Sequence, residues 1–283
     1  MTASWKEKSA LVWGATPAGS AHAPDTARRT KEFFERVVEC RNGREIRWLR
    51  ELVPFAACRG KRVLEVGCGA GYDAWEFCRH GADYTGIDLT PENPPLTRRH
   101  LALFGFAPPV LRGDAEALPF RDNSFDVYFS NGVLHHTPDL PACLAEARRV
   151  LAPGGRLMVA VYHRDSIFYW LSLALTEQLL KLGVLRRTLR QRLAMIEYTT
   201  SGVTPLVNVY GRRGLRRLAR QAGFAVLSLK ARKLLHEDLP NIPVLRRLWP
   251  AIPERWLDAT GRVFGWYLIL HATKEEERTC AGS

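Results

Sequence analysis

The sequence lacks any apolar run long enough to cross a membrane as a helix. Its longest uncharged apolar stretches, Ser166–Thr176 and Val263–Thr273, hold 11 residues each, whereas a spanning helix needs about 20. The first residues contain no hydrophobic signal-peptide segment. The six cysteines form no Cys-x-x-Cys pair and no Cys/His cluster of the metal-binding kind. We therefore expect reduced thiols, no metal and a cytoplasmic location.

Low-complexity tracts and internal repeats are also absent. Hydrophobic residues make up 46% of the 283 positions and charged residues 25%, which excludes extensive disorder and suits one large α/β domain or two small ones. The charge is unevenly distributed: residues 181–283 hold 19 of the 41 Lys and Arg but only 8 of the 29 Asp and Glu. An anionic partner is therefore expected to contact the C-terminal part of the chain.

Short β-rich runs alternate with helical stretches in the first half of the chain. Residues 1–24 are predicted to be irregular and residues 25–52 to form one or two helices. The runs that predict strands are 62–66, 83–88, 109–112, 125–130 and 156–162, and those that predict helices are 73–80 and 140–150. Strands that alternate with helices in this way indicate a parallel sheet with helices on both faces.

The alternation stops after His163. Apolar residues at helical spacing predict a helix over 167–182, and an arginine-rich amphipathic helix is predicted over 212–222. Two final strands are predicted over 224–229 and 263–273. This gives four parts, in which a helical insertion caps the substrate site: 1–52, 53–162, 163–209 and 210–283.

The most informative residues form a glycine-rich turn after the first predicted strand. Gly67, Gly69 and Gly71 follow the strand at G-x-G-x-G spacing, and a helix is predicted to follow them. Such a turn brings backbone N–H groups close to a ligand at a helix N-terminus. It is not a dinucleotide fingerprint, because Tyr72 stands where the third glycine of G-x-G-x-x-G would be, and no Lys-Ser/Thr follows as in a P-loop.

Two aspartates follow the next two predicted strands. Asp88 ends the second strand, where a carboxylate can accept hydrogen bonds from both hydroxyls of a ribose. Asp114 follows the third strand and is placed to accept from an exocyclic amine such as that of adenine. The glycine turn and both carboxylates, in this order at successive strand ends, predict a nucleoside-binding edge of the sheet.

These residues resemble the class I S-adenosylmethionine-dependent methyltransferases, in particular the type 11 branch that includes quinone-biosynthesis enzymes. The resemblance covers about Gly60–Tyr162 and includes the segments Asp122–Asp139 and Arg149–Gly155. It implies a Rossmann-like three-layer α/β sandwich with a seven-stranded, mostly parallel sheet of order 3-2-1-4-5-7-6 and an antiparallel strand 7. It also implies S-adenosylmethionine as cofactor and O- or C-methylation of a small acceptor, which we expect to be lipophilic or a secondary metabolite.

The resemblance further implies the residues of the cofactor site. Glu65 would support the glycine turn, whose three glycines pass beside the methionine and ribose. Asp88 would hold the ribose, and Asn131 would lie near the methionine end. The full implied set is Glu65, Gly67, Gly69, Gly71, Asp88, Leu89, Asp114, Ala115 and Asn131. Leu89 would pack on adenine, and Ala115 would lie beside the aspartate that takes the adenine amine.

Trp13–Ser20 is similar to an N-terminal element of one subgroup, W-x-x-x-P-C-G-S. Ala18 replaces its cysteine here, so no role for a thiol carries over.

Three histidines are candidates for the base that removes a proton from the acceptor. His135 and His136 follow the fourth strand, and His163 leaves the fifth strand towards the expected acceptor site. For His135 and His136 the alternative is that one residue starts a helix and the other packs against the cofactor. Tyr198 and Tyr210 are candidates for lining the acceptor pocket.

Two other functions stay open at this stage. The basic C-terminal half suggests an RNA methyltransferase, although its arginines lack interleaved aromatics and no Asn/Asp-Pro-Pro-Tyr/Phe segment is present, so a nucleic-acid partner is not favoured. A non-catalytic cofactor-binding protein would fit the same motifs. The apolar 167–182 stretch beside basic residues also predicts peripheral contact with an anionic membrane. The oligomeric state is not predicted.

Overall fold

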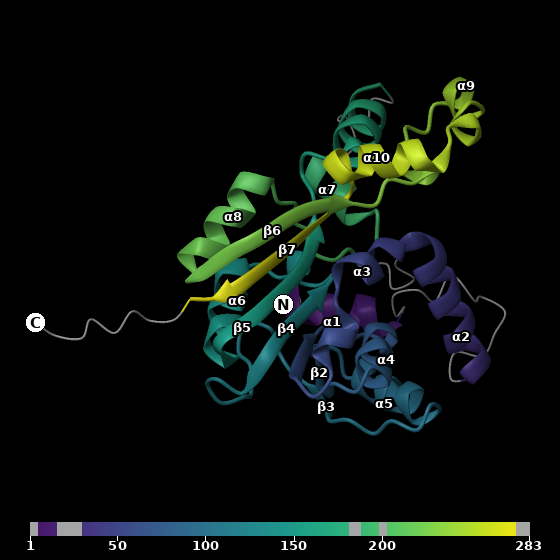
Figure 1. Ribbon diagram of the computed structural model, residues 1–283. Helices are drawn as coiled ribbons and strands as arrows, with labels where there is room; N and C mark the ends of the chain where they lie inside the picture. The colour runs from purple at the N-terminus through teal and green to yellow at the C-terminus, as the bar shows by residue number, and fades with distance from the viewer. Residues whose placement is uncertain (1–4, 16–29, 181–187, 198–202, 276–283) are drawn as a thin grey trace, which may run out of the picture.

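The computed structural model describes residues 5–15, 30–180, 188–197 and 203–275. Its centre is one seven-stranded sheet of order β3-β2-β1-β4-β5-β7-β6 (Figure 1). The strands are β1 (Arg62–Val66), β2 (Asp83–Asp88), β3 (Val110–Arg112), β4 (Phe125–Asn131), β5 (Leu151–Tyr162), β6 (Phe224–Arg232) and β7 (Tyr267–Lys274). Only β7 runs antiparallel to its neighbours, β5 and β6. The predicted fold class is confirmed.

Helices cover both faces of the sheet (Figure 1). One face carries α3 (Arg47–Leu52), α4 (Tyr72–Arg79) and α5 (Asn93–Ala102), and the other carries α6 (Leu140–Val150) and α8 (Arg212–Gln221). The remaining elements are α1 (Trp5–Ala15), α2 (Lys31–Cys40), η2 (Arg41–Glu45), η3 (Phe55–Cys58), η4 (Leu134–His136), η5 (Phe168–Leu180), α7 (Leu189–Ala194), η7 (His236–Asp238), α9 (Pro243–Arg246), η8 (Trp249–Ala251) and α10 (Glu254–Phe264).

Side-chain alternation along the strands builds two cores. Leu157, Val159 and Val161 of β5 pack with α6 and α8, whereas Met158 and Ala160 pack in the core that includes α3 and α4. Successive side chains of a strand point to opposite faces, so a strand buried on both faces is continuously apolar. This explains why β1, β4 and β5 could be predicted from their composition.

Several elements differ from the sequence predictions, and helices such as α5 and α10 were not predicted. Residues 5–15 form helix α1 instead of irregular chain; only Ser9 and Val12 of it are buried, so no apolar stripe marks it. Strand β5 begins at Leu151, with residues 152–155 bulging from the ladder between the Phe125 and Val127 pairings. The last strand begins at Tyr267, because α10 occupies the residues before it. The helix of the insertion, η5, is a π-helix.

The insertion packs onto the end of β5. Leu173 of η5 and Leu193 of α7 form a buried cluster with Tyr162 and Trp266. Outer side chains of the same helix remain exposed, Trp170 at 53%. The insertion therefore has an apolar inner and an apolar outer surface. No helix in the described part of the chain is long and apolar enough to span a membrane.

Candidate active site

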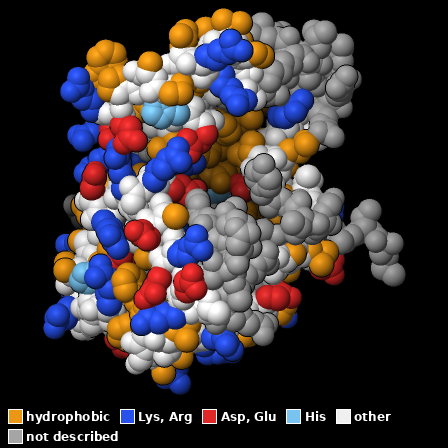
Figure 2. Space-filling view, turned by 90° about the vertical axis from the view of Figure 1, so that its right-hand side faces the viewer, with side chains coloured by type: hydrophobic (Ala, Val, Ile, Leu, Met, Phe, Trp, Pro, Cys, Tyr) orange, Lys and Arg blue, Asp and Glu red, His pale blue; other side chains and the backbone are white. Residues whose placement is uncertain are grey.

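A cavity of about 420 Å³ lies at the carboxyl ends of β1, β2 and β4. Helix α1 lies along it with Trp5, Ser9 and Trp13, which share one helix face because they are four residues apart. Figure 2 shows a hollow in this side of the molecule, with hydrophobic side chains in its depth and charges of both signs around it. This volume and position are typical of ligand sites in open α/β sheets.

The glycine turn lines one wall of the cavity. All three glycines have positive φ, between +55° and +83°. A β-carbon on Gly67 would come within 2.2 Å of Val133, and one on Gly71 within 2.8 Å of Thr97. The sequence predicts that the glycine turn brings the backbone close to a ligand. At Gly67 and Gly71 the structure shows that the glycines make room for protein side chains, and only Gly69 of the three faces open space.

Asp88 lies at the end of β2, as predicted, and its carboxylate lines the cavity. It accepts hydrogen bonds from the backbone N–H of Gly69 at 2.9 Å and of Thr90 at 3.0 Å. Burial raises the pKa of this carboxyl, and the two N–H donors oppose the rise. The carboxylate therefore also fixes the glycine turn against β2.

The residues predicted to contact adenine, Leu89, Asp114 and Ala115, line the cavity. Lys6 of α1 forms an ion pair with Asp114 and lies 3.4 Å from Glu116. This pair ties α1 to the segment after β3. An exposed pair of this kind contributes about 1 kcal/mol or less, so it orients α1 without locking it.

A polar network lines another part of the cavity. Arg41 donates to both carboxylate oxygens of Asp73, at 2.6 and 3.1 Å, and the amide of Asn131 donates to Asp73 at 3.0 Å. Glu65 lies beside it, but its carboxylate accepts from the Tyr84 hydroxyl at 2.6 Å instead of supporting the glycine turn as we expected. Burial and the charge of Asp73 raise the pKa of Glu65 well above its usual range.

Helix α5 supports the turn from outside the cavity. The Thr97 hydroxyl donates to the Gly69 carbonyl at 2.7 Å, and His100 donates through Nδ1 to the Ala70 carbonyl at 2.9 Å. The His100 ring stacks on Phe34 at 3.7 Å between centroids. Burial lowers the pKa of His100 to about 4. Nothing in the sequence pattern singled out these supports.

The structure separates the three candidate base histidines. His136 lines the cavity, His135 lies fully buried behind it against the Tyr162 ring at 3.7 Å, and burial lowers the pKa of both. His163 does not reach the cavity: it is buried, and its Nδ1 donates to the Gly265 carbonyl at 2.9 Å. Because Tyr162 faces the cavity, the next side chain of the chain points to the other side.

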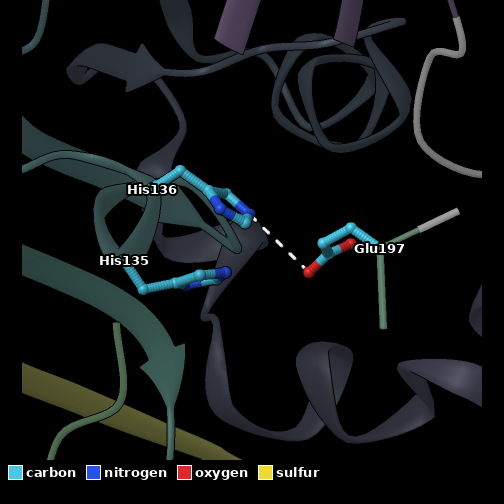
Figure 3. Close-up of side chains that lie close together, drawn as sticks. All are labelled: His135, His136 and Glu197. Carbon is cyan, nitrogen blue, oxygen red and sulfur yellow. Dashed lines mark ion pairs between the residues drawn. The ribbon is translucent and has the colours of Figure 1, made fainter. Parts of the chain in front are cut away.

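Glu197 faces His136 across the cavity (Figure 3). Its carboxylate oxygen lies 3.8 Å from His136 Nε2 and accepts from the Tyr162 hydroxyl at 2.6 Å.

Tyr210 packs against the core beside α6 and α8, outside the cavity lining, so the prediction that it lines the acceptor pocket is wrong. Tyr198 and residues 16–20 of the tryptophan-containing element lie outside the described residues.

Comparisons with known proteins identify the central segment. Residues 64–159 match the family model described as a methyltransferase domain. This segment contains the glycine turn, Asp88, Asp114 and both histidines after β4. The segment is similar to methyltransferase domains, and this match and the strand order confirm the resemblance to the class I S-adenosylmethionine-dependent methyltransferases.

The matches to curated relatives cover about a third to a half of this chain. The chain is 47% identical over 103 residues to the phthiotriol/phenolphthiotriol dimycocerosates methyltransferase of Mycobacterium leprae, covering 36% of this chain and 37% of the relative. It is 32% identical over 136 residues to the ubiquinone biosynthesis O-methyltransferase of Ralstonia nicotianae, covering 48% and 56%. The match thus spans about a third to a half of these relatives' length.

A solved structure shares the fold over nearly the whole chain. A chain from the complex between the Haloferax volcanii Trm112 methyltransferase activator and the putative methyltransferase aligns with a TM-score of 0.60 and 19% identity. The alignment covers 92% of this chain and 99% of that chain. The sheet and its flanking helices are therefore a recurrent arrangement.

Proposed function

We propose that the protein transfers the methyl group of S-adenosylmethionine to oxygen or carbon of a small lipophilic acceptor. The observation that carries this proposal is the division of one cavity into two ends. The glycine turn, Asp88 and Asp114 form the end suited to a nucleoside, whereas Tyr162, Ile196 and Tyr267 form an apolar end with His136 and Glu197. The methyltransferase-domain match and the lipid and quinone names of its relatives support it.

In this proposal the cofactor supplies an electrophilic methyl group on a sulfonium. Asp88 holds the ribose hydroxyls and Asp114 accepts from the adenine amine, while Trp5, Ser9 and Trp13 of α1 line the cavity. Alignment of the two reactants can supply up to about 7–11 kcal/mol of the barrier reduction. His136 lines the cavity and is therefore the candidate base that removes the acceptor's proton. His163 is not a candidate, because it lies outside the cavity lining.

The test is detection of S-adenosylhomocysteine with a panel of lipophilic phenols, quinone precursors and fatty acids. Product with one acceptor class supports the proposal. Cofactor binding without turnover on any acceptor leaves the non-catalytic alternative standing. The site does not support the RNA methyltransferase alternative, because the arginines of α8 do not line the cavity. Retention on heparin without methylated product on RNA would exclude this alternative.

We further propose that the end of the molecule around η5, α9 and α10 contacts an anionic membrane. Apolar side chains are exposed there: Trp170, Leu171, Leu175, Val244, Leu245, Leu248, Trp256, Val263 and Phe264. The exposed Arg246, Arg247 and Arg255 lie in and beside the same elements. Figure 1 places α9 and α10 together at the top of the view. Apolar and basic side chains side by side are typical of interfacial binding.

Contacts connect this surface to the cavity. The Ser172 hydroxyl of η5 donates to the Asp238 carbonyl at 2.6 Å, which ties η5 to the segment before α9. The inner face of η5 packs on Tyr162, which lines the apolar end of the cavity. A lipophilic acceptor could thus enter next to the membrane. The cytoplasmic location expected from the sequence stays a prediction.

Co-sedimentation with vesicles tests the membrane contact. We expect binding to phosphatidylcholine vesicles that contain phosphatidylglycerol, weaker binding at high salt, and several-fold weaker binding after Trp256→Ser. Leu111→Ser is the matched control, because this residue is also apolar and exposed but lies on β3, away from η5, α9 and α10. Equal binding of both variants, or none by the wild type at low salt, would contradict the proposal.

A further inference from the structure

We propose that His135, His136 and Glu197 bind a divalent transition-metal ion at the apolar end of the cavity. One ligand atom of each residue, imidazole nitrogen or carboxylate oxygen, lies within 4.8 Å of the others. Figure 3 shows both rings and the carboxylate directed into one gap. Two imidazoles and a carboxylate form a ligand set typical of catalytic Zn²⁺ and non-haem Fe²⁺. Bonds of about 2.0–2.2 Å require the side chains to move together by roughly an ångström.

The first independent observation is the buried, unpartnered ring of His135. Its exposed fraction is 0%, and neither ring nitrogen has a hydrogen-bond partner among the described residues. An unsatisfied buried polar atom costs about 1–3 kcal/mol. A metal ion in the gap would use one of these nitrogens as a ligand.

The second observation is the set of hydrogen bonds behind the ligand atoms. His136 donates through Nδ1 to the Leu206 carbonyl at 2.8 Å, so the lone pair of Nε2 is directed towards Glu197. The Tyr162 hydroxyl donates to the Glu197 carboxylate at 2.6 Å. Metal-binding histidines and carboxylates are commonly oriented by such outer hydrogen bonds.

A simple ion pair explains less of this arrangement. His136 Nε2 and the Glu197 oxygen are 3.8 Å apart, beyond hydrogen-bond distance. The pair would also leave His135 without a role. A bound ion accounts for the gap and for both rings.

The role of the ion rests on the proposed methyl transfer. His136 and Glu197 line the cavity, so open coordination positions would face the acceptor. An acceptor hydroxyl bound to the ion becomes more acidic and releases its proton to water. The oxygen then forms a bond to the methyl carbon, the carbon–sulfur bond breaks, and its electron pair stays on sulfur as S-adenosylhomocysteine leaves. His136 would then hold the ion instead of acting as the base.

Metal titration of the full chain tests the site without any acceptor. After chelator treatment, we expect one equivalent of Zn²⁺ to bind in calorimetry, and Co²⁺ to give an absorption spectrum typical of nitrogen and oxygen ligands. Glu197→Gln, which can still accept from the Tyr162 hydroxyl, and His136→Gln should each weaken binding at least ten-fold. His80→Gln, which removes a histidine at the C-terminal end of α4 and outside the cavity lining, should not.

Two results would overturn the site: no stoichiometric Zn²⁺ or Co²⁺ binding by the wild type, or equal affinity in Glu197→Gln and His80→Gln. Circular dichroism of each variant verifies that it is folded. Metal binding without S-adenosylhomocysteine production would leave the site standing and remove the proposed activity. Production that persists in metal-free protein would remove the catalytic role of the ion and leave the proposed activity standing.

Discussion

A β-carbon on Gly67 would lie 2.2 Å from a methyl group of Val133, so the glycine turn and the segment after β4 are in direct contact. This contact joins the two chain segments that form the centre of the cavity. It means that Gly67 is required by protein packing before any ligand binds.

We expect Gly67→Ala to lower the free energy of unfolding by about 2–4 kcal/mol, from overpacking and from a positive φ that disfavours alanine. Gly69→Ala should cost only about 1 kcal/mol, because its β-carbon meets open space. Urea denaturation measures both values. In a Val133→Ala background the cost of Gly67→Ala should fall by more than 1 kcal/mol; an unchanged cost would show that the methyl contact is not the cause.

Asp88→Ala should weaken S-adenosylmethionine binding at least ten-fold in calorimetry. Charge-assisted hydrogen bonds to the ribose contribute about 1.5–3 kcal/mol each, and about 1.4 kcal/mol is a factor of ten. Asp83→Ala is the control, because this exposed aspartate begins the same strand at its other end. Equal affinity of both variants would refute the ribose assignment, provided that unfolding curves show Asp88→Ala to be folded.

The Arg41–Asp73 pair should behave as a buried ion pair, since the two side chains are 15% and 5% exposed. Asp73→Asn leaves the guanidinium without its carboxylate and should cost about 3–5 kcal/mol of unfolding free energy. The double variant Arg41→Met/Asp73→Asn should recover part of this loss, because no charge then remains unpaired. Additive losses in the double-mutant cycle would mean that the pair does not couple.

Stability should decrease in acid through His100. Its folded-state pKa of about 4 lies below the ordinary value of 6.5. Between these values the unfolded chain binds more protons than the folded chain, so the free energy of unfolding falls as the pH falls from about 6.5 to 4. The contribution amounts to at most about 3 kcal/mol.

His100→Phe removes this titration while keeping a ring against Phe34. The difference in stability between wild type and variant, measured in urea at several pH values, should therefore shift in favour of the variant on acidification. Parallel pH curves would show that another buried group causes the acid sensitivity.

The sequence alone determined the sheet and the positions of Asp88 and Asp114 at its edge. Continuous apolar strands could be recognised locally, and Asp88 and Asp114 follow parallel strands whose carboxyl ends meet at one edge. Their approximate positions thus follow from strand order, without knowledge of side-chain packing.

Only the tertiary structure decided what closes the cavity and which side chains after β4 and β5 face it. The Lys6–Asp114 and Glu197–His136 contacts join segments far apart in the chain, and no local pattern encodes such contacts. The direction of a single side chain is equally non-local. Tyr162 reaches the cavity and His163 does not, because neighbouring residues at the end of a strand point to opposite sides of the sheet and the tertiary fold sets which side holds the site.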